Sequence, residues 1–330
     1  MDKISLRSAI GKAALLVGII ICMTVFQDRF GSENMLVGIT LITALLMFLK
    51  TDIGVKTSQA PLLIVGLFVA IVCAALLANL NPLVLLAFNL AFVFAIMYLT
   101  TARIEDRSYL PFMLCYLFIQ GIPVSENAFS ARLASVVICG IIIAGVYWAV
   151  HAKKPSPDAS VGSIIRAIDV HSPRFSFALR MAVGVSVAML AGELLQTDKA
   201  MWIGLTVFSL TQPERKAVME RFGKRMLGTA IGAIVFVVVF IYLVPAEYQP
   251  IAILLFGYIY MFAKDYEMQI MFITVNALAT AALLFDPKTA IVGRIALIVI
   301  GFAIAFAVNG IPWSKLTSAL SQASSHQGQR

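Results

Sequence analysis

The stretch that decides the fold is MWIGLTVFSLTQPERKAVMERFGKRMLGTAIG, at residues 201–232. It opens with a short apolar segment, 200–212, turns into a charged helix after Pro213, and returns to an apolar segment at Met226. As an α-helix the first segment spans about 20 Å, whereas the hydrocarbon layer of a bilayer is about 30 Å thick. Shortened or interrupted spans at matching places in two halves of a membrane protein indicate a substrate path. The matching segment in this chain is 35–49.

Composition places the chain in a membrane. Hydrophobic residues make up 61% of its 330 residues, whereas charged residues make up only 13%, about half the average for soluble proteins. No soluble core would bury that many hydrophobic residues. The net charge of +8 does not indicate nucleic acid, because the basic residues follow loops on one side of the predicted bilayer. The cysteines and histidines show no metal-site or catalytic spacing, so we expect no metal, no cofactor and no enzymatic activity.

The apolar segments predict an all-α, polytopic membrane protein with about 12 transmembrane helices. The predicted spans are 10–26, 35–49, 61–79, 82–99, 110–124, 131–150, 178–195, 200–212, 226–244, 249–263, 268–285 and 290–309. With both termini cytoplasmic, all but five of the 25 Lys and Arg residues lie on the inner side, as the positive-inside rule requires. Those on the outer side are Arg29, Arg132, Lys199, Lys288 and Arg294.

An internal repeat relates the two halves of the chain. The recurring motifs are Arg7-x-Ala9-x-Gly11 with Arg180-x-Ala182-x-Gly184, Met35-x-x-Gly38-x-Thr40 with Met201-x-x-Gly204-x-Thr206, and Arg132-x-Ala134 with Arg294-x-Ala296. Because six spans per copy is an even number, both repeats share one orientation and are related by an axis along the membrane normal. The predicted parts are a first six-helix repeat at 1–150, a cytoplasmic linker with a short interfacial helix at 151–177, a second six-helix repeat at 178–310 and a disordered cytoplasmic tail at 311–330.

Several motifs of the second half occur in a fixed order. They are Leu179-Arg180-x-Ala182, Gln212-Pro213, Arg225-x-x-Gly228-Thr229-x-x-Gly232, and Arg294 with Gly301 in the same span. This set resembles the fusaric-acid-resistance-like family, which includes bacterial aromatic acid exporters and has plant malate channels as distant relatives. Typical exporters of that family carry large cytosolic domains after each membrane half. This chain has only the linker and the tail, so it resembles a compact, membrane-only member.

The resemblance implies a function in export. It points to a bacterial inner-membrane efflux transporter for aromatic or other organic carboxylic acids, coupled to protons and working with a periplasmic adaptor (membrane fusion) protein. The implied partners are the organic anion, the adaptor and the lipid bilayer, with a homo-oligomer left open. No G-x-x-x-x-G-K motif is present, so ATP hydrolysis by this chain is not expected. Two alternatives remain open, namely an organic-anion channel and a non-transport membrane scaffold of an envelope complex.

Three arginines are the expected anion-binding residues of the substrate path. Arg225 is placed at the inner edge and Arg294 at the outer edge, with Arg132 as the repeat partner of Arg294. A guanidinium binds a carboxylate bidentately. The alternatives are a solvated basic helix around Arg225 and outer arginines that snorkel to lipid phosphates. The other predicted path residues are Thr40, Thr206, Trp202, Gln212, Thr229 and Asn276.

Acidic residues near the membrane are the predicted proton-coupling groups. Glu193 and Asp265 are selected because carboxylates at membrane depth often serve as proton relays, although both lie at span boundaries. Glu193 is preferred, since its repeat partner is Ile20 and the repeat gives no structural need for a charge there. The Gly228-x-x-x-Gly232 motif predicts close contact between two helices.

Overall fold

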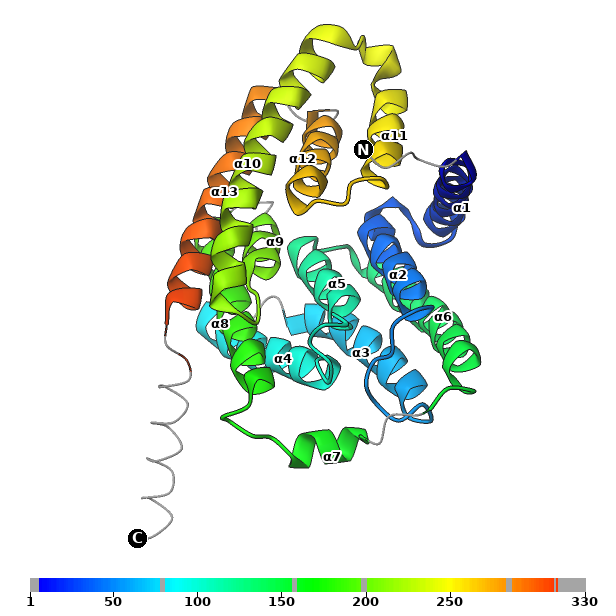
Figure 1. Ribbon diagram of the computed structural model, residues 1–330, viewed down its shortest axis with the longest axis vertical. Coiled ribbons are helices and arrows are strands. Elements are labelled where there is room, and N and C mark those ends of the chain that lie inside the picture. The colour runs from blue at the N-terminus through cyan, green and yellow to red at the C-terminus, as the bar shows by residue number, and fades with distance from the viewer. Residues whose placement is uncertain are drawn as a thin grey trace. The chain divides into compact units, whose positions relative to one another are not determined.

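The computed structural model describes residues 6–77, 81–155, 159–196, 201–282, 287–311 and 313, without the side chains of 215, 281 and 287–292. All regular elements in these ranges are helical, which confirms the predicted all-α class (Figure 1). The α-helices are α1 (Leu6–Phe30), α2 (Met35–Phe48), α3 (Ala60–Ala74), α4 (Pro82–Thr100), α5 (Leu110–Gly121), α6 (Glu126–His151), α7 (Val161–Arg166), α8 (Pro173–Leu194), α9 (Met201–Leu210), α10 (Arg215–Phe236), α11 (Gln249–Tyr260), α12 (Tyr266–Ala282) and α13 (Pro287–Gly310). Short 3-10 turns lie at Ser32–Asn34, Ala75–Leu77 and Ala246–Tyr248, and a π-helical segment, Val237–Leu243, continues α10.

Several helices begin where a polar side chain caps a proline-initiated first turn. α4 begins at Pro82 after Asn81, whose side-chain oxygen accepts a backbone N–H at 3.0 Å. α8 begins at Pro173 after Ser172, whose hydroxyl accepts a backbone N–H at 3.1 Å. Proline suits this position because its missing N–H would have no partner in the first turn. These local signals fix where the spans start.

Within the described residues, seven helices are long and apolar enough to cross a membrane. They are Leu6–Phe30, Ala60–Leu77, Pro82–Thr100, Glu126–His151, Pro173–Leu194, Lys216–Leu243 and Gly293–Gly310. The other predicted spans are also helical in their described parts, but shorter, namely α2, α5, α9, α11 and α12. Large apolar side chains such as Ile138, Ile141 and Ile142 are exposed, as expected of a surface that faces lipid. The chain is therefore a multi-pass helical membrane protein.

The two segments predicted to be short are short helices. α2 has 14 residues and α9 has 10. At 1.5 Å per residue they extend about 21 and 15 Å, less than the roughly 30 Å of a hydrocarbon layer. Both helices pack against α5. The two interrupted spans thus lie on one common helix.

The chain divides into two compact units, which are described separately. Unit 1 is formed by Met1–Cys22 with Glu214–Phe302, and unit 2 by Met23–Pro213 with Ala303–Arg330. These divisions differ from the halves 1–150 and 178–310, so the two six-helix repeats stay a prediction. The predicted tail, 311–330, lies outside the described residues except at 311 and 313.

The core of unit 2 is built from aromatic side chains of α2, α3, α5 and α6. The Phe112 ring lies 5.9 Å from Phe48 and 4.8 Å from Phe68, and Phe48 meets Tyr147 edge-on at 6.0 Å. These side chains are at most 1% exposed. Offset and edge-on pairs are the favoured geometries of aromatic rings, so this cluster holds the four helices together.

The connections of unit 2 gather at two opposite ends. At one end, the Asn34 amide donates to the carbonyl of Ala128 at 3.1 Å, which joins the α1–α2 connection to the start of α6. At the other, the Ser108 hydroxyl donates to the Asp52 carbonyl at 3.0 Å, and the Lys56 N–H donates to the Ala159 carbonyl at 2.8 Å. Successive helices therefore alternate in direction, as the predicted topology requires.

One of these ends is rich in basic residues, and we call it the basic end. Its Lys and Arg residues are Lys50, Lys56, Arg103, Arg107, Lys153, Lys154, Arg166 and Arg174. The opposite end of unit 2 has Arg29 and Arg132. Because cytoplasmic loops are enriched in Lys and Arg, the basic end is the predicted cytoplasmic end.

Single cysteines at positions 29 and 154 are expected to react from opposite sides of the membrane. Arg29 and Lys154 are exposed residues at opposite ends of unit 2. After replacement of the four native cysteines, a membrane-impermeant maleimide should label position 29 in intact cells and position 154 only after permeabilisation. Labelling of both from one side would contradict the alternation of the helices, and the reverse pattern would contradict the cytoplasmic assignment.

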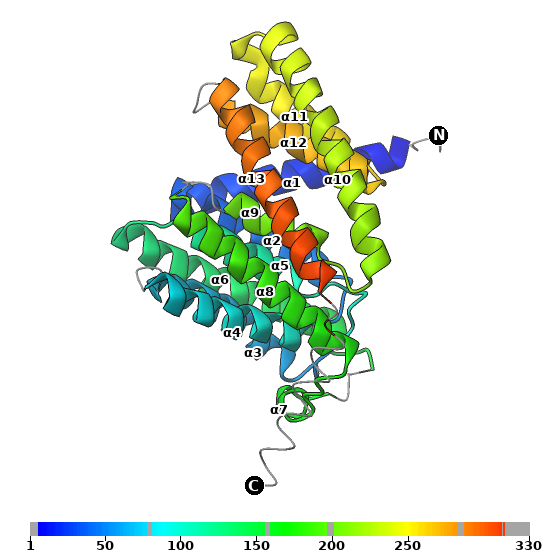
Figure 2. The same ribbon diagram turned by 90° about the vertical axis from the view of Figure 1, so that its left-hand side faces the viewer.

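Two helix contacts join spans that belong to different predicted repeats. In unit 2, α8 packs along α4 (Figure 2). In unit 1, the Lys12 ammonium of α1 donates to the Met261 carbonyl at 2.8 Å, and the Tyr258 hydroxyl of α11 donates to the Ala9 carbonyl at 3.1 Å. α1 and α8 are the first spans of the predicted repeats, and α4 and α11 are the fourth. Both contacts join the first span of one predicted repeat to the fourth span of the other, and the two-fold relation itself stays a prediction.

Candidate functional site

The break after α9 is held by side chains of unit 2. The Gln212 amide donates to the carbonyls of Ser209 at 3.3 Å and Thr211 at 2.9 Å, which lie at the C-terminal end of the helix. The guanidinium of Arg180 on α8 donates to the Pro213 carbonyl at 2.6 Å. The Ser209 carbonyl belongs to the last turn of α9, where carbonyls lack partners within the helix, and the other two carbonyls lie just beyond that helix. Gln212 and Arg180 thus fix the place where the short span ends.

Arg180 is a residue whose role the sequence did not indicate. In the sequence it belongs to a motif and is one of the basic residues predicted on the inner side of the membrane. In the structure it is 8% exposed and bridges α8 to the break after α9. The signals in the sequence were its recurrence with Arg7 in the repeat and its place in the Leu179-Arg180-x-Ala182 motif, and Arg7 is exposed on α1.

α10 corrects the expectation of a separate charged helix followed by a new span. It begins at Arg215 and continues without interruption through Phe236, then as a π-helix through Leu243. On its surface Lys224 and Glu220 form an ion pair at 2.7 Å across one turn. The charged and apolar segments therefore form a single span, because the segment after Arg215 contains no helix-breaking proline.

The predicted glycine contact is present between α10 and α12 in unit 1. A Cβ on Gly228 would lie 2.5 Å from the Glu267 carbonyl oxygen, and one on Gly232 would lie 2.7 Å from that of Met271. No larger side chain fits there without moving backbone. The pair therefore brings the two helices into direct backbone contact, as small-residue motifs do in membranes.

Arg225 lies beside the first turn of α12. Its Nη1 donates to the Tyr266 hydroxyl at 3.5 Å, while the Arg221 guanidinium lies over the Tyr266 ring, 4.7 Å from the centroid. Arg221 and Arg225 are four residues apart and so share one face of α10. Tyr266 is thus contacted by two arginines, one through its π-face and one through its oxygen.

Arg294 lies within electrostatic range of Arg225. It is 9% exposed, and the positive charge of Arg225 repels its positive charge. The rings of Phe222 on α10 and Phe302 on α13 lie 4.7 Å apart, so these helices pack together within unit 1. The expectation that Arg225 and Arg294 mark opposite membrane edges stays a prediction. Because α10 begins at Arg215, Arg225 lies about 15 Å inside the helix instead of at its end.

Other polar groups of unit 1 lie along the same helices. Thr229 is 9% exposed and follows Arg225 by one turn on α10. On α12, the Oε2 atom of Glu267 and the Oδ1 atom of Asn276 are buried without a hydrogen-bond partner among the described residues. Buried polar atoms without partners are rare and call for an explanation such as a ligand or water. The α10–α12–α13 region therefore combines two cationic groups with unsatisfied acceptors.

Arg132 in unit 2 has a different environment from its predicted repeat partner. It is 1% exposed, and its guanidinium donates to Asn34 Oδ1 at 2.8 Å, to the Ile122 carbonyl at 3.0 Å and to the Glu33 carbonyl at 3.3 Å. These acceptors belong to two connections and join them to α6. The arrangement fits a structural clamp, although a role in the path remains a proposal.

Replacing Arg132 with Gln is expected to destabilise unit 2. The change removes three hydrogen bonds and leaves the buried Asn34 oxygen without this donor, and an unsatisfied buried acceptor costs about 1–3 kcal/mol. The measurement is the midpoint of thermal unfolding of the purified protein, with Arg29→Gln as the control because Arg29 is exposed at the same end. An Arg132→Gln midpoint equal to that of the control would show that the clamp contributes nothing.

The predicted threonines of the path are buried in unit 2. The Thr40 hydroxyl donates to the Val37 carbonyl at 2.7 Å, and that of Thr206 to the Trp202 carbonyl at 2.8 Å. Both threonines are 0% exposed, and Trp202 is half-buried. These bonds use the hydroxyl hydrogens within the helices. Neither threonine lies on a surface open to lipid.

The selected acidic residues lie near the surface. Glu193 is exposed on α8, beside a narrow groove that Asn89 of α4 also lines. Asp265 is exposed just before α12, and its charge, like that of Glu267, acts on Lys224. Glu267 differs from both because one of its carboxylate oxygens is buried.

A polar network at the basic end was not indicated by the sequence. The Oδ1 atom of Asp52 accepts the Tyr147 hydroxyl at 3.0 Å and the Gly54 N–H at 2.6 Å. Tyr147 stacks on His151, whose Nε2 lies 2.9 Å from the Phe48 carbonyl at the end of α2. The sequence placed His151 in the linker, whereas it is the last residue of α6 and 2% exposed. This network anchors the end of the short span α2.

Fold and motifs together define a multi-pass helical membrane protein with a paired-arginine region. Residues 187–308 match the family described as "Fusaric acid resistance protein-like", which confirms the resemblance predicted from the motifs. This segment includes both Arg225 and Arg294, and the family is one of membrane transport proteins.

One relative extends the comparison. The "Uncharacterized protein YhfK" of Escherichia coli (strain K12) is 30% identical over 163 residues, which are 48% of this chain and 23% of that protein. The chain therefore spans less than a quarter of that relative's length in the match. No solved structure gives a significant match.

Proposed function

We propose that the protein is an efflux transporter of the bacterial inner membrane for organic carboxylic acids, with aromatic acids as the first class to test. Transport is driven by protons, with both termini in the cytoplasm and a periplasmic adaptor carrying the substrate onward. The family match supports the transport class, and the basic end of unit 2 supports the orientation.

The observations that carry the proposal are the family match and the place of Arg225 and Arg294 in unit 1, where the charge of Arg225 acts on that of Arg294. Two positive charges close together in a region of low dielectric repel each other, and an anion between them relieves that repulsion. A carboxylate that leaves water must regain its lost hydration from fixed donors. Arginine supplies those donors in a planar fork that matches a carboxylate. Tyr266 adds an aromatic face and a hydroxyl next to Arg225.

The coupling proton is proposed to reside on a carboxylate near this region. Glu193 and Asp265 remain proposed carriers, and Glu267 joins them because of its buried oxygen beside the basic face of α10. Ionisable groups held in membrane segments are costly and so tend to serve transport. Asn276, Thr229, Thr40, Thr206, Trp202 and Gln212 remain proposed path residues.

Export by cells tests the proposed function. A strain that lacks the gene is compared with the same strain carrying it on a plasmid, and the cellular content of a radiolabelled aromatic acid is measured. Expression should lower the content against the concentration gradient. A protonophore should abolish this uphill export, whereas downhill flux would persist through an organic-anion channel. Equal content with and without the protein would instead favour a membrane scaffold.

A further inference from the structure

The segment 159–167 is docked on the basic end of unit 2. The Ala159 carbonyl accepts the Lys56 N–H at 2.8 Å, and the Val161 N–H donates to Gln59 Oε1 at 2.9 Å. At its far end, the Ala167 carbonyl accepts the Tyr98 hydroxyl at 3.3 Å. α7 is thus fixed against the start of α3 and the end of α4, instead of hanging free in the linker.

The outward face of this segment presents apolar side chains beside a basic one. Ile164 is 4% exposed and anchors α7 to the core, whereas Ile165 and Ile168 are 53% and 46% exposed. Arg166, between them, is also exposed. Exposed isoleucines beside a basic residue are typical of a segment that lies in a membrane interface.

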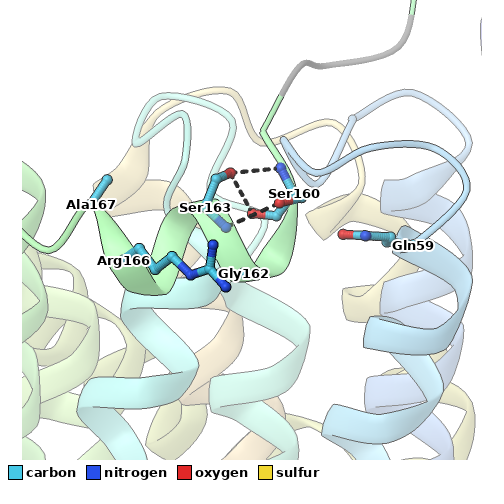
Figure 3. A pocket seen from close by; sticks show the side chains of 6 residues that line it. All are labelled: Gln59, Ser160, Gly162, Ser163, Arg166 and Ala167. Carbon is cyan, nitrogen blue, oxygen red and sulfur yellow. Dashed lines mark hydrogen bonds between the residues drawn. The ribbon is translucent and has the colours of Figure 1, made fainter.

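An open depression of about 470 Å³ lies beside α7, which is within the usual range for ligand sites (Figure 3). Its lining residues are Gln59, Ser160, Gly162, Ser163, Arg166 and Ala167. The Arg166 side chain folds back under Gly162, while the hydroxyls of Ser160 and Ser163 close a capping box at the start of the helix (Figure 3). Arg166 is thus the one charged group among the residues that line the depression.

The charges around the depression favour an anion. Lys56 and Arg174 of the basic end lie next to the docked segment. The backbone N–H of Lys56 donates to the Ala159 carbonyl, and the Arg174 guanidinium donates to the carbonyl of Tyr98, whose hydroxyl bonds to Ala167. On the C-terminal side of the depression, the carboxylate of Asp169 lies 3.5 Å from the His171 ring. Anionic lipids of the cytoplasmic leaflet present phosphates at the depth where such a segment lies.

We propose that this depression binds the phosphate headgroup of an anionic phospholipid, with Arg166 contacting the phosphate and Ile165 and Ile168 reaching into the acyl region. The site belongs to unit 2, whereas Arg225 and Arg294 belong to unit 1, and it does not depend on which substrate is carried. It would hold the linker at the membrane surface on the basic end.

The test uses the purified full chain in detergent and measures the midpoint of thermal unfolding against added lipid. Phosphatidylglycerol should raise the midpoint more than phosphatidylcholine does. Arg166→Gln should weaken the apparent affinity for phosphatidylglycerol about five-fold, as expected from roughly 1 kcal/mol per basic residue at an anionic surface. Arg103→Gln is the matched control, because Arg103 is also a basic-end residue with a 61% exposed side chain.

A second variant tests the apolar part of the site. Ile168→Asn should weaken the response to phosphatidylglycerol while the unfolding midpoint without lipid stays that of the wild type. An Arg166→Gln response equal to that of Arg103→Gln would overturn the proposal. The proposal would also fail if glycerol 3-phosphate without lipid reproduced the full stabilisation, because the site would then bind a soluble phosphate.

Discussion

Replacing Gly228 or Gly232 with Ala should destabilise unit 1 by about 1–3 kcal/mol, the usual cost of forcing atoms into a packed interface. The added methyl groups would stand 2.5 Å from the Glu267 carbonyl oxygen and 2.7 Å from that of Met271. Both obstacles are backbone atoms, so relief requires α10 and α12 to separate. The measurement is the thermal midpoint and the yield of folded protein in detergent.

A third glycine on the same helix provides the control. Gly223 has no atom within 4 Å of the position its Cβ would take. Gly223→Ala should be neutral or stabilising by up to about 1 kcal/mol, because alanine favours the helix. If Gly228→Ala and Gly232→Ala behaved like Gly223→Ala, the backbone contact between α10 and α12 would not hold.

Neutralising either paired arginine should cripple carboxylate export. A charge-assisted hydrogen bond is worth about 1.5–3 kcal/mol, so Arg225→Gln or Arg294→Gln should weaken apparent affinity about 10- to 150-fold where binding limits transport. Arg225→Lys keeps the charge but loses the planar fork, and should retain part of the activity. Export of a radiolabelled aromatic acid from energised cells, normalised to membrane abundance, measures the effect.

A matched variant separates anion binding from general charge. Arg221→Gln removes a cation one turn away from Arg225, where the guanidinium lies over the Tyr266 ring. Export should fall less in Arg221→Gln than in Arg225→Gln. Wild-type export by both Arg225→Gln and Arg294→Gln would show that these arginines serve topology or lipid anchoring instead.

The sequence alone predicted the features that depend on residues close together in the chain. Apolar segments long enough to be helical, with capping residues such as Asn81 and Ser172 before proline, placed the helices to within a few residues, except for the start of α10. The contact made by Gly228 and Gly232 also followed from spacing alone, because residues four apart share a helix face. The family resemblance rested on motifs whose order can be read directly from the chain.

Contacts between segments that are far apart in the chain could not be predicted from the sequence. Arg132 and Asn34 are 98 residues apart, and their bond depends on how two connections pack at one end of unit 2. The repeat suggested equal roles for Arg132 and Arg294, yet the former meets backbone carbonyls and the latter lies near another arginine. The place of Arg225 within its helix depended on where α10 begins, and a charged segment gives no sign of whether it continues into the next span.

Transport of a carboxylate by the purified protein tests the central claim most directly. Proteoliposomes are loaded with a radiolabelled aromatic acid or with its uncharged amide of the same size, and efflux is followed with wild-type protein and with the Arg225→Gln, Arg294→Gln double variant. The wild type should release the acid faster than the amide, and the double variant should lose that preference. Equal release of acid and amide by the wild type, or an unchanged preference in the double variant, would contradict a path for organic carboxylates built on these two arginines.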